Sequence, residues 1–580
     1  MRDRKVINIK NHKQQQIFDP WSYLGPKRRR LLDESWAGLF QREILHELPV
    51  HKLACYFDSG FGRPSKELYT SLGVLLFQQT NDLTDEEACQ QLAFNIQWHY
   101  ALNLYEESDA AKYICPKTLW TLRSILTENS IDVDIFDAVR NKLAQVFKVN
   151  TDDQRIDSVH IKSNMRKLGR IGIFVSGISK FLRNLKRSHR GRFDAIENGF
   201  EVKYLSEKGK RSFSMIKPSD SHKTLSEVSN DLHCLVEQFK DCSDVTGMDS
   251  YKLLVRILNE QCNVIESGKE TEIEIKKPKD ISSDSLQNPS DPEATYSGHK
   301  GQGYQVQIME TYTKTEDESE KAQTLNLITH VEVEQSHKSD ANALIPAIEE
   351  TKEQGLAPKE VLADSLYGSD ENCQTAKELE VTVLSPVMGR KKDKNISLSE
   401  FQFNEKGDVV RCPSGNSPIK AHGKKSRHSA CFSRRHCSKC CNIRGCPVKK
   451  GEKFYYLRYT DKELRVAIRR AYEDTDEFID RYRWRAGVEA TMSEYDRRTG
   501  VKQLRVRGLQ NVRFCAVLKA VGINIFRATA VRKALIGINN KIFSNNYIFS
   551  VVKEQVLRIY DYVSRFLSNF GKIYDCERVF

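Results

Sequence analysis

The sequence predicts an α/β protein with a mixed sheet at its core, an all-helical domain ahead of it and a cysteine-rich insertion within it. Apolar residues recur at helical spacing through the first 150 residues. Later segments follow the order strand, two strands, helix, strand, helix, strand, which is typical of an α/β layer. Six of the 15 cysteines fall between Cys412 and Cys446. The expected division is 1–150 for the helical N-terminal domain, 151–400 with 455–535 for the sheet domain, about 170–295 for a helical insertion in it, 401–454 for the cysteine-rich insertion and 536–580 for a helical C-terminal tail.

The helical N-terminal domain has clear start signals. Thr84, with Glu87 three residues later, matches the capping box that begins a helix. The basic run Lys27–Arg30 precedes these helices. A module that binds DNA ends and a scaffold or dimer contact both remain open, because amphipathic helices alone specify no ligand. The apolar stripes are formed by Leu68, Leu72, Leu75 and Leu76 and, further on, by Ile135, Val139, Leu143 and Val146.

The sheet domain is predicted to begin with the β-rich segment Arg155–Lys162, which contains Asp157. A long, mostly helical region follows it, and its polar last part, 267–295, predicts a surface linker or long loop.

Two strands are predicted after this loop, because Tyr304–Ile308 and Leu327–Val333 alternate apolar with polar residues, as in a hairpin. A compact apolar strand, Val361–Ala363, then ends at Asp364. The remaining expected elements are a helix at about 341–353 and a strand at 381–384.

Asp157 and Asp364 are candidate metal ligands, because aspartates on neighbouring strands can meet over one edge of a sheet. Mg²⁺ prefers carboxylate oxygens, and two such ions about 4 Å apart serve phosphoryl transfer. Glu489, on a helix-forming segment with Arg485 one turn earlier, is the candidate for a third carboxylate. Singly, each signal has a plainer interpretation: a strand-end aspartate usually forms a turn, and an arginine–glutamate pair is usually a surface contact. Asp152, Asp153 and Asp370 compete for the same roles.

The charge distribution points to a polyanionic partner. The net charge is +13, and the pI is near 8.9. Residues 401–520 hold 28 Lys and Arg against 13 Asp and Glu, so this stretch carries a surplus of 15. A solvated basic face without a ligand is the alternative. The cations that surround Gly508 are Lys502, Arg505, Arg507 and Arg513.

The cysteine cluster is expected to bind structural zinc. Cys437 and Cys440 have the spacing that lets two thiolates reach one tetrahedral Zn²⁺, and Cys412 with Cys446 would supply the other two. Cys431 or Cys441 remains an alternative ligand, and a cysteine-rich loop without metal remains an alternative site.

The N-terminus predicts a cytoplasmic protein, because Met1–Lys10 is charged and has no apolar signal segment. No membrane span is expected either. The longest apolar stretches, such as Ala516–Phe526 with Lys519 inside it, fall short of the roughly 20 apolar residues that a span requires. Cysteines in that compartment stay reduced, which favours a metal site over disulfides.

Three segments resemble the catalytic blocks of DDE-type transposases of bacterial insertion sequences, which belong to the RNase H-like superfamily. They are the segment around Asp157, the run Val361–Gly368, and Tyr482–Glu489. In that family the last block carries Tyr, two residues, Arg, three residues and Glu, which Tyr482, Arg485 and Glu489 match.

The family pattern expects Lys seven residues after the glutamate, but this chain has Asp496 there. Arg497 is the nearest candidate for the phosphate contact. Gly62–Pro64, Trp98 and Asp291–Thr295 also resemble one branch of the family, and the likeness covers roughly residues 20–530.

The resemblance implies an RNase H-like core with two Mg²⁺ or Mn²⁺ ions held by Asp157, Asp364 and Glu489. It implies nicking of double-stranded DNA at transposon ends, attack by the freed 3′ hydroxyl on target DNA, a homodimer in the active complex, and a nucleoid-associated protein. A non-catalytic DNA-binding protein derived from a transposase and a nuclease of the same fold are the alternatives. The residues expected to contact DNA are Tyr482, Arg485, Arg497, Lys502, Arg505 and Arg507.

Overall fold

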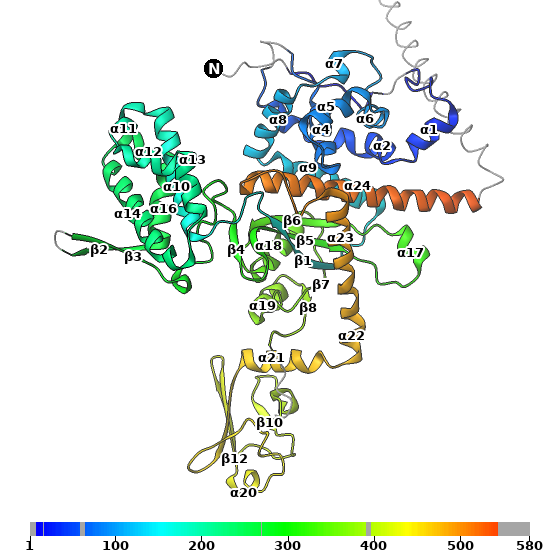
Figure 1. The fold of residues 1–580 in the computed structure, drawn as a ribbon. Helices are drawn as coiled ribbons and strands as arrows, with labels where there is room; N and C mark the ends of the chain where they lie inside the picture. The colour runs from blue at the N-terminus through cyan, green and yellow to red at the C-terminus, as the bar shows by residue number, and fades with distance from the viewer. Residues whose placement is uncertain (1–6, 15–16, 59–63, 268–269, 390–395, 543–580) are drawn as a thin grey trace, which may run out of the picture.

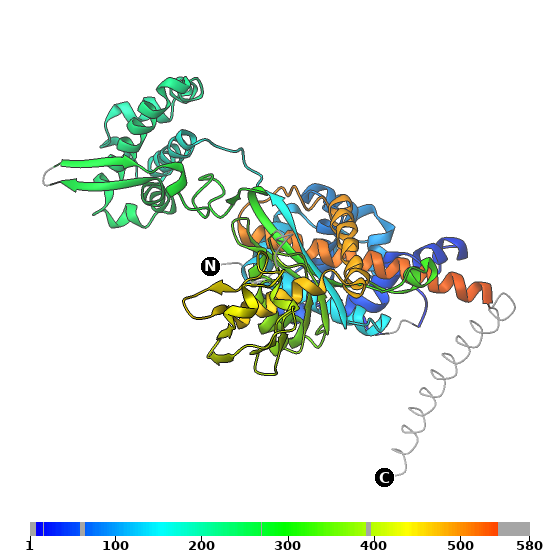
Figure 2. The same ribbon diagram turned by 90° about the horizontal axis from the view of Figure 1, so that it is seen from below.

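The computed structural model describes residues 7–14, 17–58, 64–267, 270–389 and 396–542. A mixed sheet lies at the centre, with N-terminal helices packed on one side (Figure 1). A helical lobe and a cysteine-rich β domain extend from it in different directions (Figures 1 and 2).

The N-terminal helices form one core together with the sheet. The predicted capping box of Thr84 and Glu87 is present at the start of α5. Val146 was expected on the buried stripe but is 39% exposed, because it lies near the end of α9. The helices are α1 (Pro26–Asp33), α2 (Trp36–Leu39), a π-helix (Phe40–Ile44), a 3₁₀ turn (Leu45–Glu47), α3 (Val50–Ala54), α4 (Leu68–Thr80), α5 (Asp85–Phe94), α6 (Ile96–Ala101), α7 (Asp109–Lys112), α8 (Pro116–Glu128) and α9 (Ile131–Phe147).

The central sheet runs in the order β4-β5-β1-β7-β8, and β6 also pairs with β5. β5 is antiparallel to β1, β4 and β6, whereas β7 is parallel to both β1 and β8. The predicted hairpin strands are confirmed as β5 and β6. The strands are β1 (Asp153–Lys162), β4 (Thr295–Ser297), β5 (Gly301–Thr311), β6 (Ile328–Gln335), β7 (Glu360–Leu362) and β8 (Thr382–Leu384).

The two faces of the sheet bury different helices, because alternate side chains of a strand point to opposite faces. Ile156, Met309 and Val361 pack in a cluster with residues of α18. Val306 and Ile308 point the other way and pack in the core that contains α24. The helices around the sheet are α17 (Glu318–Gln323), α18 (Leu344–Glu353), α19 (Asp370–Glu378) and α24 (Leu509–Ile542), with a 3₁₀ turn at Asp340–Asn342.

Helix α24 crosses between the N-terminal helices and the sheet (Figure 1). Contrary to the expectation from the sequence, the described residues contain one stretch that is long and apolar enough to cross a membrane, Leu509–Gly537. Of its most apolar window, 83% is buried inside the fold, so this is a core helix. The expected tail 536–580 begins within α24, and residues 543–580 lie outside the described residues.

The lobe between β1 and β4 has its own hydrophobic core. The predicted long loop 267–295 is wrong in part, because β2 (Cys262–Ser267) and β3 (Glu270–Ile275) form a hairpin. Its alternating charged side chains carry no strong apolar signal. The helices of the lobe are α10 (Arg170–Ser188), α11 (Arg190–Asp194), α12 (Asn198–Tyr204), α13 (Glu207–Ser214), α14 (Ser221–Phe239), α15 (Ser243–Thr246) and α16 (Asp249–Gln261), with 3₁₀ turns at Pro218–Asp220 and Pro278–Asp280.

The cysteine-rich domain is a small β structure with a separate core. Its four-stranded sheet has the order β11-β12-β14-β13, and β9 pairs with β10. Its elements are a 3₁₀ turn (Leu398–Glu400), β9 (Gln402–Phe403), β10 (Val409–Arg411), β11 (Lys420–Lys424), β12 (Arg427–Phe432), α20 (Arg434–Cys437), β13 (Lys449–Lys450) and β14 (Tyr455–Thr460).

The chain returns from this domain to the sheet through a broken helical segment (Figure 1). The segments are α21 (Asp461–Tyr472), α22 (Asp476–Tyr482), a 3₁₀ turn (Arg483–Ala486) and α23 (Gly487–Thr499).

Candidate active site

Asp157 and Asp364 stand beside each other at the centre of the sheet. The parallel pairing of β1 with β7 sets Arg155 opposite Leu362. Asp364 follows the end of β7 by two residues, and its negative charge acts on the Asp157 carboxyl. Residues two apart on a strand share a face, and the Arg155 guanidinium donates a 2.7 Å hydrogen bond to the carbonyl oxygen of Trp484. Both carboxylates therefore face the segment that leads into α23.

The electrostatics of Asp157 reflect this proximity. Burial raises the pKa of the Asp157 carboxyl above its ordinary value, and the negative charges of Asp364 and Asp340 raise it further. The Arg485 guanidinium and the Ser158 amide oppose that shift. The Asp157 carboxyl thus lies in a partly buried site with a second carboxylate nearby. This pair therefore has the charge and the hard oxygen donors that suit a divalent cation.

Arg485 contacts Asp157 and also lies near Glu489. Arg485 Nη2 donates a 2.8 Å hydrogen bond to Asp157 Oδ2, and its Nη1 lies 3.7 Å from Glu489 Oε1. The Glu489 side chain is 76% exposed, in the first turn of α23. The Tyr482 hydroxyl donates a 3.2 Å hydrogen bond to the carbonyl oxygen of Ala363, next to Asp364.

As the side chains stand, the described residues contain no group of three His, Cys, Asp or Glu side chains ready to hold a metal ion. Arg485 occupies the space between Asp157 and Glu489 and supplies the positive charge there. The Glu489 side chain is largely exposed to solvent, whereas the Asp157 side chain is only 18% exposed.

Asp364 also forms the turn that a strand-end aspartate usually forms, because its Oδ1 accepts the Leu366 amide at 2.8 Å. The competing aspartates are occupied elsewhere by ion pairs. They are Asp152 with Lys359 at 2.9 Å, Asp153 with Lys314 at 2.6 Å, and Asp370 with Arg465 at 2.6 Å.

A buried polar network holds α23 against the sheet, and the sequence analysis did not identify it. Glu310, on β5, is fully buried and forms ion pairs with Arg155 at 2.7 Å and with Arg527 at 2.8 Å. Thr491 of α23 donates a 2.8 Å hydrogen bond to the same carboxylate. The two arginines outweigh burial and lower the pKa of Glu310. The sequence did contain one sign of this network: an acidic residue, Glu310, among the apolar residues of the predicted strand β5.

Gly487 allows α23 to begin close to this network. A Cβ atom at this position would collide with the Arg155 guanidinium. Glu489 lies only two residues after Gly487. The close approach of Arg155 to the backbone at Gly487 therefore helps to set the position of the Glu489 backbone.

A second network supports the opposite face of the same strands. Lys300 Nζ contacts Asp340 at 2.8 Å and Ser158 Oγ at 2.8 Å. Gln307 donates a 2.9 Å hydrogen bond to Asp340, and the buried Tyr367 hydroxyl donates one of 2.5 Å to Gln307. Ser158 follows Asp157 in β1, so these contacts fix the strand that carries Asp157.

The predicted DNA-binding cations divide into two groups. Arg497 and Arg507 are exposed. Lys502 lies 3.6 Å from Asp496, and Arg505 lies 3.3 Å from Asp82, in exposed pairs that solvent screens.

Arg513, one of the cations that surround Gly508, forms an ion pair inside the fold. It contacts Asp132, which is fully buried, at 3.1 Å.

The basic turn that contains Lys502, Arg505 and Arg507 is fixed to the end of β1. The Lys162 amide donates a 2.9 Å hydrogen bond to the carbonyl oxygen of Lys502. The buried Asp291 accepts the Gly508 amide at 3.1 Å and the Tyr304 hydroxyl at 2.6 Å. The turn therefore lies beside the end of β1, the strand that carries Asp157. At 3.3 Å per residue, Asp157 and Lys162 are roughly 17 Å apart along this strand.

The cysteine-rich domain brings the four predicted zinc ligands to one small cavity. Cys412, Cys437, Cys440 and Cys446 all line it. Cys431 points elsewhere, with its thiol 3.3 Å from the carbonyl oxygen of Lys420.

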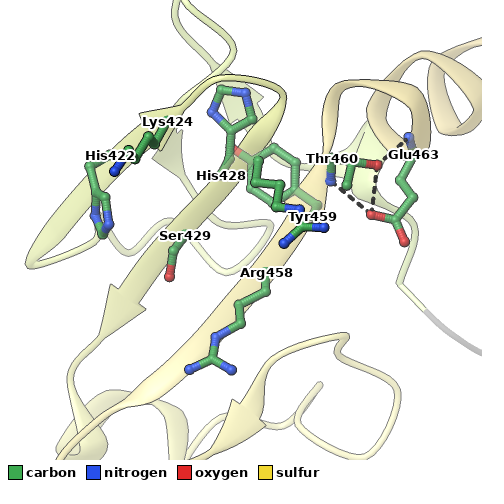
Figure 3. A pocket seen from close by; sticks show the side chains of 9 residues that line it. His422, Lys424, His428, Ser429, Arg458, Tyr459, Thr460 and Glu463 are labelled. Atoms are coloured by element: carbon green, nitrogen blue, oxygen red, sulfur yellow. Dashed lines mark hydrogen bonds between the residues drawn. The ribbon is translucent and has the colours of Figure 1, made fainter.

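A larger cavity of about 360 Å³ lies on the sheet of the same domain (Figure 3). Lys424, Arg427 and Arg458 line it, with His422 beside them. His428, at its edge, stacks on Tyr459 and contacts Asp408 at 2.9 Å and Asp461 at 2.7 Å. Burial opposes the charge of His428, but the two carboxylates outweigh it and raise its pKa.

Comparison with known protein families gives two matches. Residues 411–529 match the model described as transposase DDE domain, a range that includes Glu489 and the cysteine cluster. Residues 37–124, within the N-terminal helices, match the model described as transposase domain (DUF772). No curated protein matches the chain. Both families are transposase families, and they match separate parts of one chain that also carries the Tyr482, Arg485 and Glu489 block. The two matches therefore support the identification of the chain as a DDE-type transposase of an insertion sequence.

Proposed function

We propose that this transposase cuts double-stranded DNA at the ends of its element and joins the freed 3′ ends to target DNA, using Asp157, Asp364 and Glu489. The observation that supports the proposal is that Asp364, just after β7, lies close enough for its charge to act on Asp157 of the neighbouring strand β1, while Arg485 contacts both Asp157 and Glu489. The transposase DDE domain match supports phosphoryl-transfer chemistry of this class.

The strand order supports an RNase H-like catalytic core. Within the central sheet, β1, β5 and β6 are antiparallel neighbours, and β7 and β8 extend the sheet parallel to β1. Asp157 lies on β1, and Asp364 lies two residues after the end of β7.

The three carboxylates would hold two Mg²⁺ or Mn²⁺ ions. When bound, such ions activate the attacking oxygen and stabilise the leaving oxygen of a phosphodiester. The chain's own part is to keep Asp157 and Asp364 adjacent through strand pairing and to hold α23 through Glu310.

Arg485 has a second role in this proposal. Its guanidinium contacts Asp157 at 2.8 Å and lies 3.7 Å from Glu489. A DNA phosphate offers the same guanidinium a bidentate partner, so DNA binding would draw Arg485 away from the carboxylates and leave them free for cations.

The exposed cations would contact the sugar–phosphate backbone of DNA. Arg497, Arg507, Lys502 and Arg505 would bind phosphates along a path that leads from Asp157 to the end of β1. Tyr482 would orient DNA beside Asp364.

The cysteine-rich domain would extend this DNA-binding surface, because residues 401–460 contain 14 Lys and Arg against 3 Asp and Glu. A homodimer in the active complex and association with the nucleoid stay predictions from the family resemblance.

The test uses a labelled duplex that carries the sequences flanking the gene, a supercoiled target plasmid and Mg²⁺. Joined products support the proposal. Cut products without joining favour a nuclease, and retention on a gel without cutting favours a DNA-binding protein, so either result overturns strand transfer.

Glu489→Gln is expected to abolish cleavage and leave duplex retention unchanged. The matched control is Glu349→Gln, the same change at an exposed position of α18, which should cut and join like the wild type. Cleavage by the Glu489→Gln protein would remove this residue from the mechanism.

A further inference from the structure

Four cysteines from separate parts of the cysteine-rich domain meet at one enclosed site. Cys412 follows β10, and Cys437 ends α20. Cys440 and Cys446 lie in the loop before β13. The cavity that they line has a volume of about 20 Å³, and Phe432, Ile443 and Val448 close it with apolar surface.

Backbone amides point at three of the four sulfur atoms. The Asn416 amide donates to Cys412 Sγ at 3.3 Å. The Asn442 amide donates to Cys440, and the Val448 amide donates to Cys446. An N–H group directed at sulfur stabilises a thiolate over a thiol, because it places positive charge beside the anion.

We propose that Cys412, Cys437, Cys440 and Cys446 bind one structural Zn²⁺ ion. Four thiolates satisfy the tetrahedral preference of zinc and leave no open position for substrate, which marks the site as structural and separate from the carboxylates of the sheet domain. The ion would join the turn after β10 to the loop between α20 and β13.

The structure selects these four cysteines from the six in the cluster. The thiol of Cys431 is directed at the carbonyl oxygen of Lys420, on the neighbouring strand β11. Cys441 is exposed and is absent from the cavity lining. Ser414 Oγ lies 3.2 Å from Cys440 Sγ, so the turn that carries Cys412 already contacts the second half of the site.

The sulfur atoms do not yet stand in the arrangement of a ligated ion. All four nevertheless line one cavity of about 20 Å³.

The domain needs such a link because its hydrophobic core is small. Seven buried side chains make up its separate cluster. Domains of this size gain much of their stability from disulfides or a metal, and all the cysteines of the cluster are free.

The test measures metal in the full-length protein, without DNA. Metal analysis after exhaustive dialysis is expected to find about one zinc per chain. Replacement by Co²⁺ should give the intense visible absorption of a tetrahedral thiolate site. Protein that stays soluble with no zinc, or that takes up Co²⁺ without this absorption, would overturn the proposal.

Two variants locate the ligands. Cys440→Ser should lose the bound zinc, while Cys440→His should keep it, because imidazole is also a zinc ligand. Cys431→Ser is the matched control and should hold zinc like the wild type. Equal loss from Cys431→Ser and Cys440→Ser would contradict the assigned set. If Cys440→Ser is insoluble, the cobalt spectrum of the wild type still decides. Because no measurement involves cleavage, failure here is distinct from failure of the proposed DNA chemistry.

Discussion

The Arg485 guanidinium donates a 2.8 Å hydrogen bond to the carboxylate of Asp157, whose pKa the nearby charge of Asp364 helps to raise. A positive side chain thus occupies the place where a cation is expected to bind.

Removing this charge should therefore favour metal binding in the absence of DNA. In Arg485→Gln, Mn²⁺ affinity is expected to rise roughly two- to fivefold, the effect of losing a partly exposed ion pair. DNA cleavage should fall about 100-fold, because a charged group directed at the phosphodiester is lost. Electron paramagnetic resonance of free Mn²⁺ measures the first effect, and a cleavage assay measures the second.

Arg483→Gln serves as the control for this experiment, since Arg483 is exposed and contacts Glu316 and Asp480 instead. Unchanged Mn²⁺ affinity in Arg485→Gln would show that the guanidinium does not compete with metal.

Glu310 should be essential for the stability of the sheet domain. Glu310→Gln leaves Arg155 and Arg527 without their buried partner, and losing one member of such a network costs about 3–5 kcal/mol in the free energy of unfolding. Urea denaturation measures this loss.

Thr491→Val removes only a hydroxyl that donates to the same carboxylate. It is expected to cost about 1 kcal/mol. A Glu310→Gln protein as stable as the wild type would mean that the network does not fasten α23.

The exposed and buried cations near α23 and α24 should behave differently. Arg497→Gln and Arg507→Gln are each expected to lower the salt dependence of DNA binding by about one phosphate contact, with a slope change of about 0.9. Their stability should not change. Fluorescence anisotropy at several salt concentrations provides the measurement.

Arg513→Gln is the opposite case, because it leaves the fully buried Asp132 unpaired. About 3 kcal/mol of stability should be lost, while the salt slope stays that of the wild type. A reduced salt dependence of DNA binding in this variant would show that Arg513 contacts DNA.

His428 should make the cysteine-rich domain sensitive to pH. Burial lowers the pKa of this imidazole, but hydrogen bonds that the carboxylates of Asp408 and Asp461 accept raise it more. The folded pKa therefore lies above the ordinary 6.5. Its charge pairs therefore contribute in full below pH 6.5, and this contribution is lost as the pH rises through the folded pKa.

The Tm of the wild type should accordingly fall toward that of His428→Gln as the pH increases from about 6 to 9. Scanning calorimetry of both proteins at constant zinc concentration checks the difference. A gap between the two proteins that widens with pH would contradict the assigned charge state.

The sequence alone determined the local elements and the types of residue at the site. The capping box at Thr84, the alternating strands β5 and β6, and the Tyr482, Arg485 and Glu489 spacing depend on neighbours within a few residues, so pattern and period identify them. The hairpin β2–β3 was missed because its few apolar residues, such as Ile273 and Ile275, stand at the start of a long segment that is polar on the whole.

Only the tertiary structure decided which distant residues meet. Glu310 and Arg155 are 155 positions apart, and no local pattern links an inward acid on one strand to an arginine on another. The distinction between Arg507, which is exposed, and Arg513, which is paired with buried Asp132, likewise depends on packing. Register, burial and charge pairing arise when strands and helices come together, and they determine which of many similar side chains are left to act.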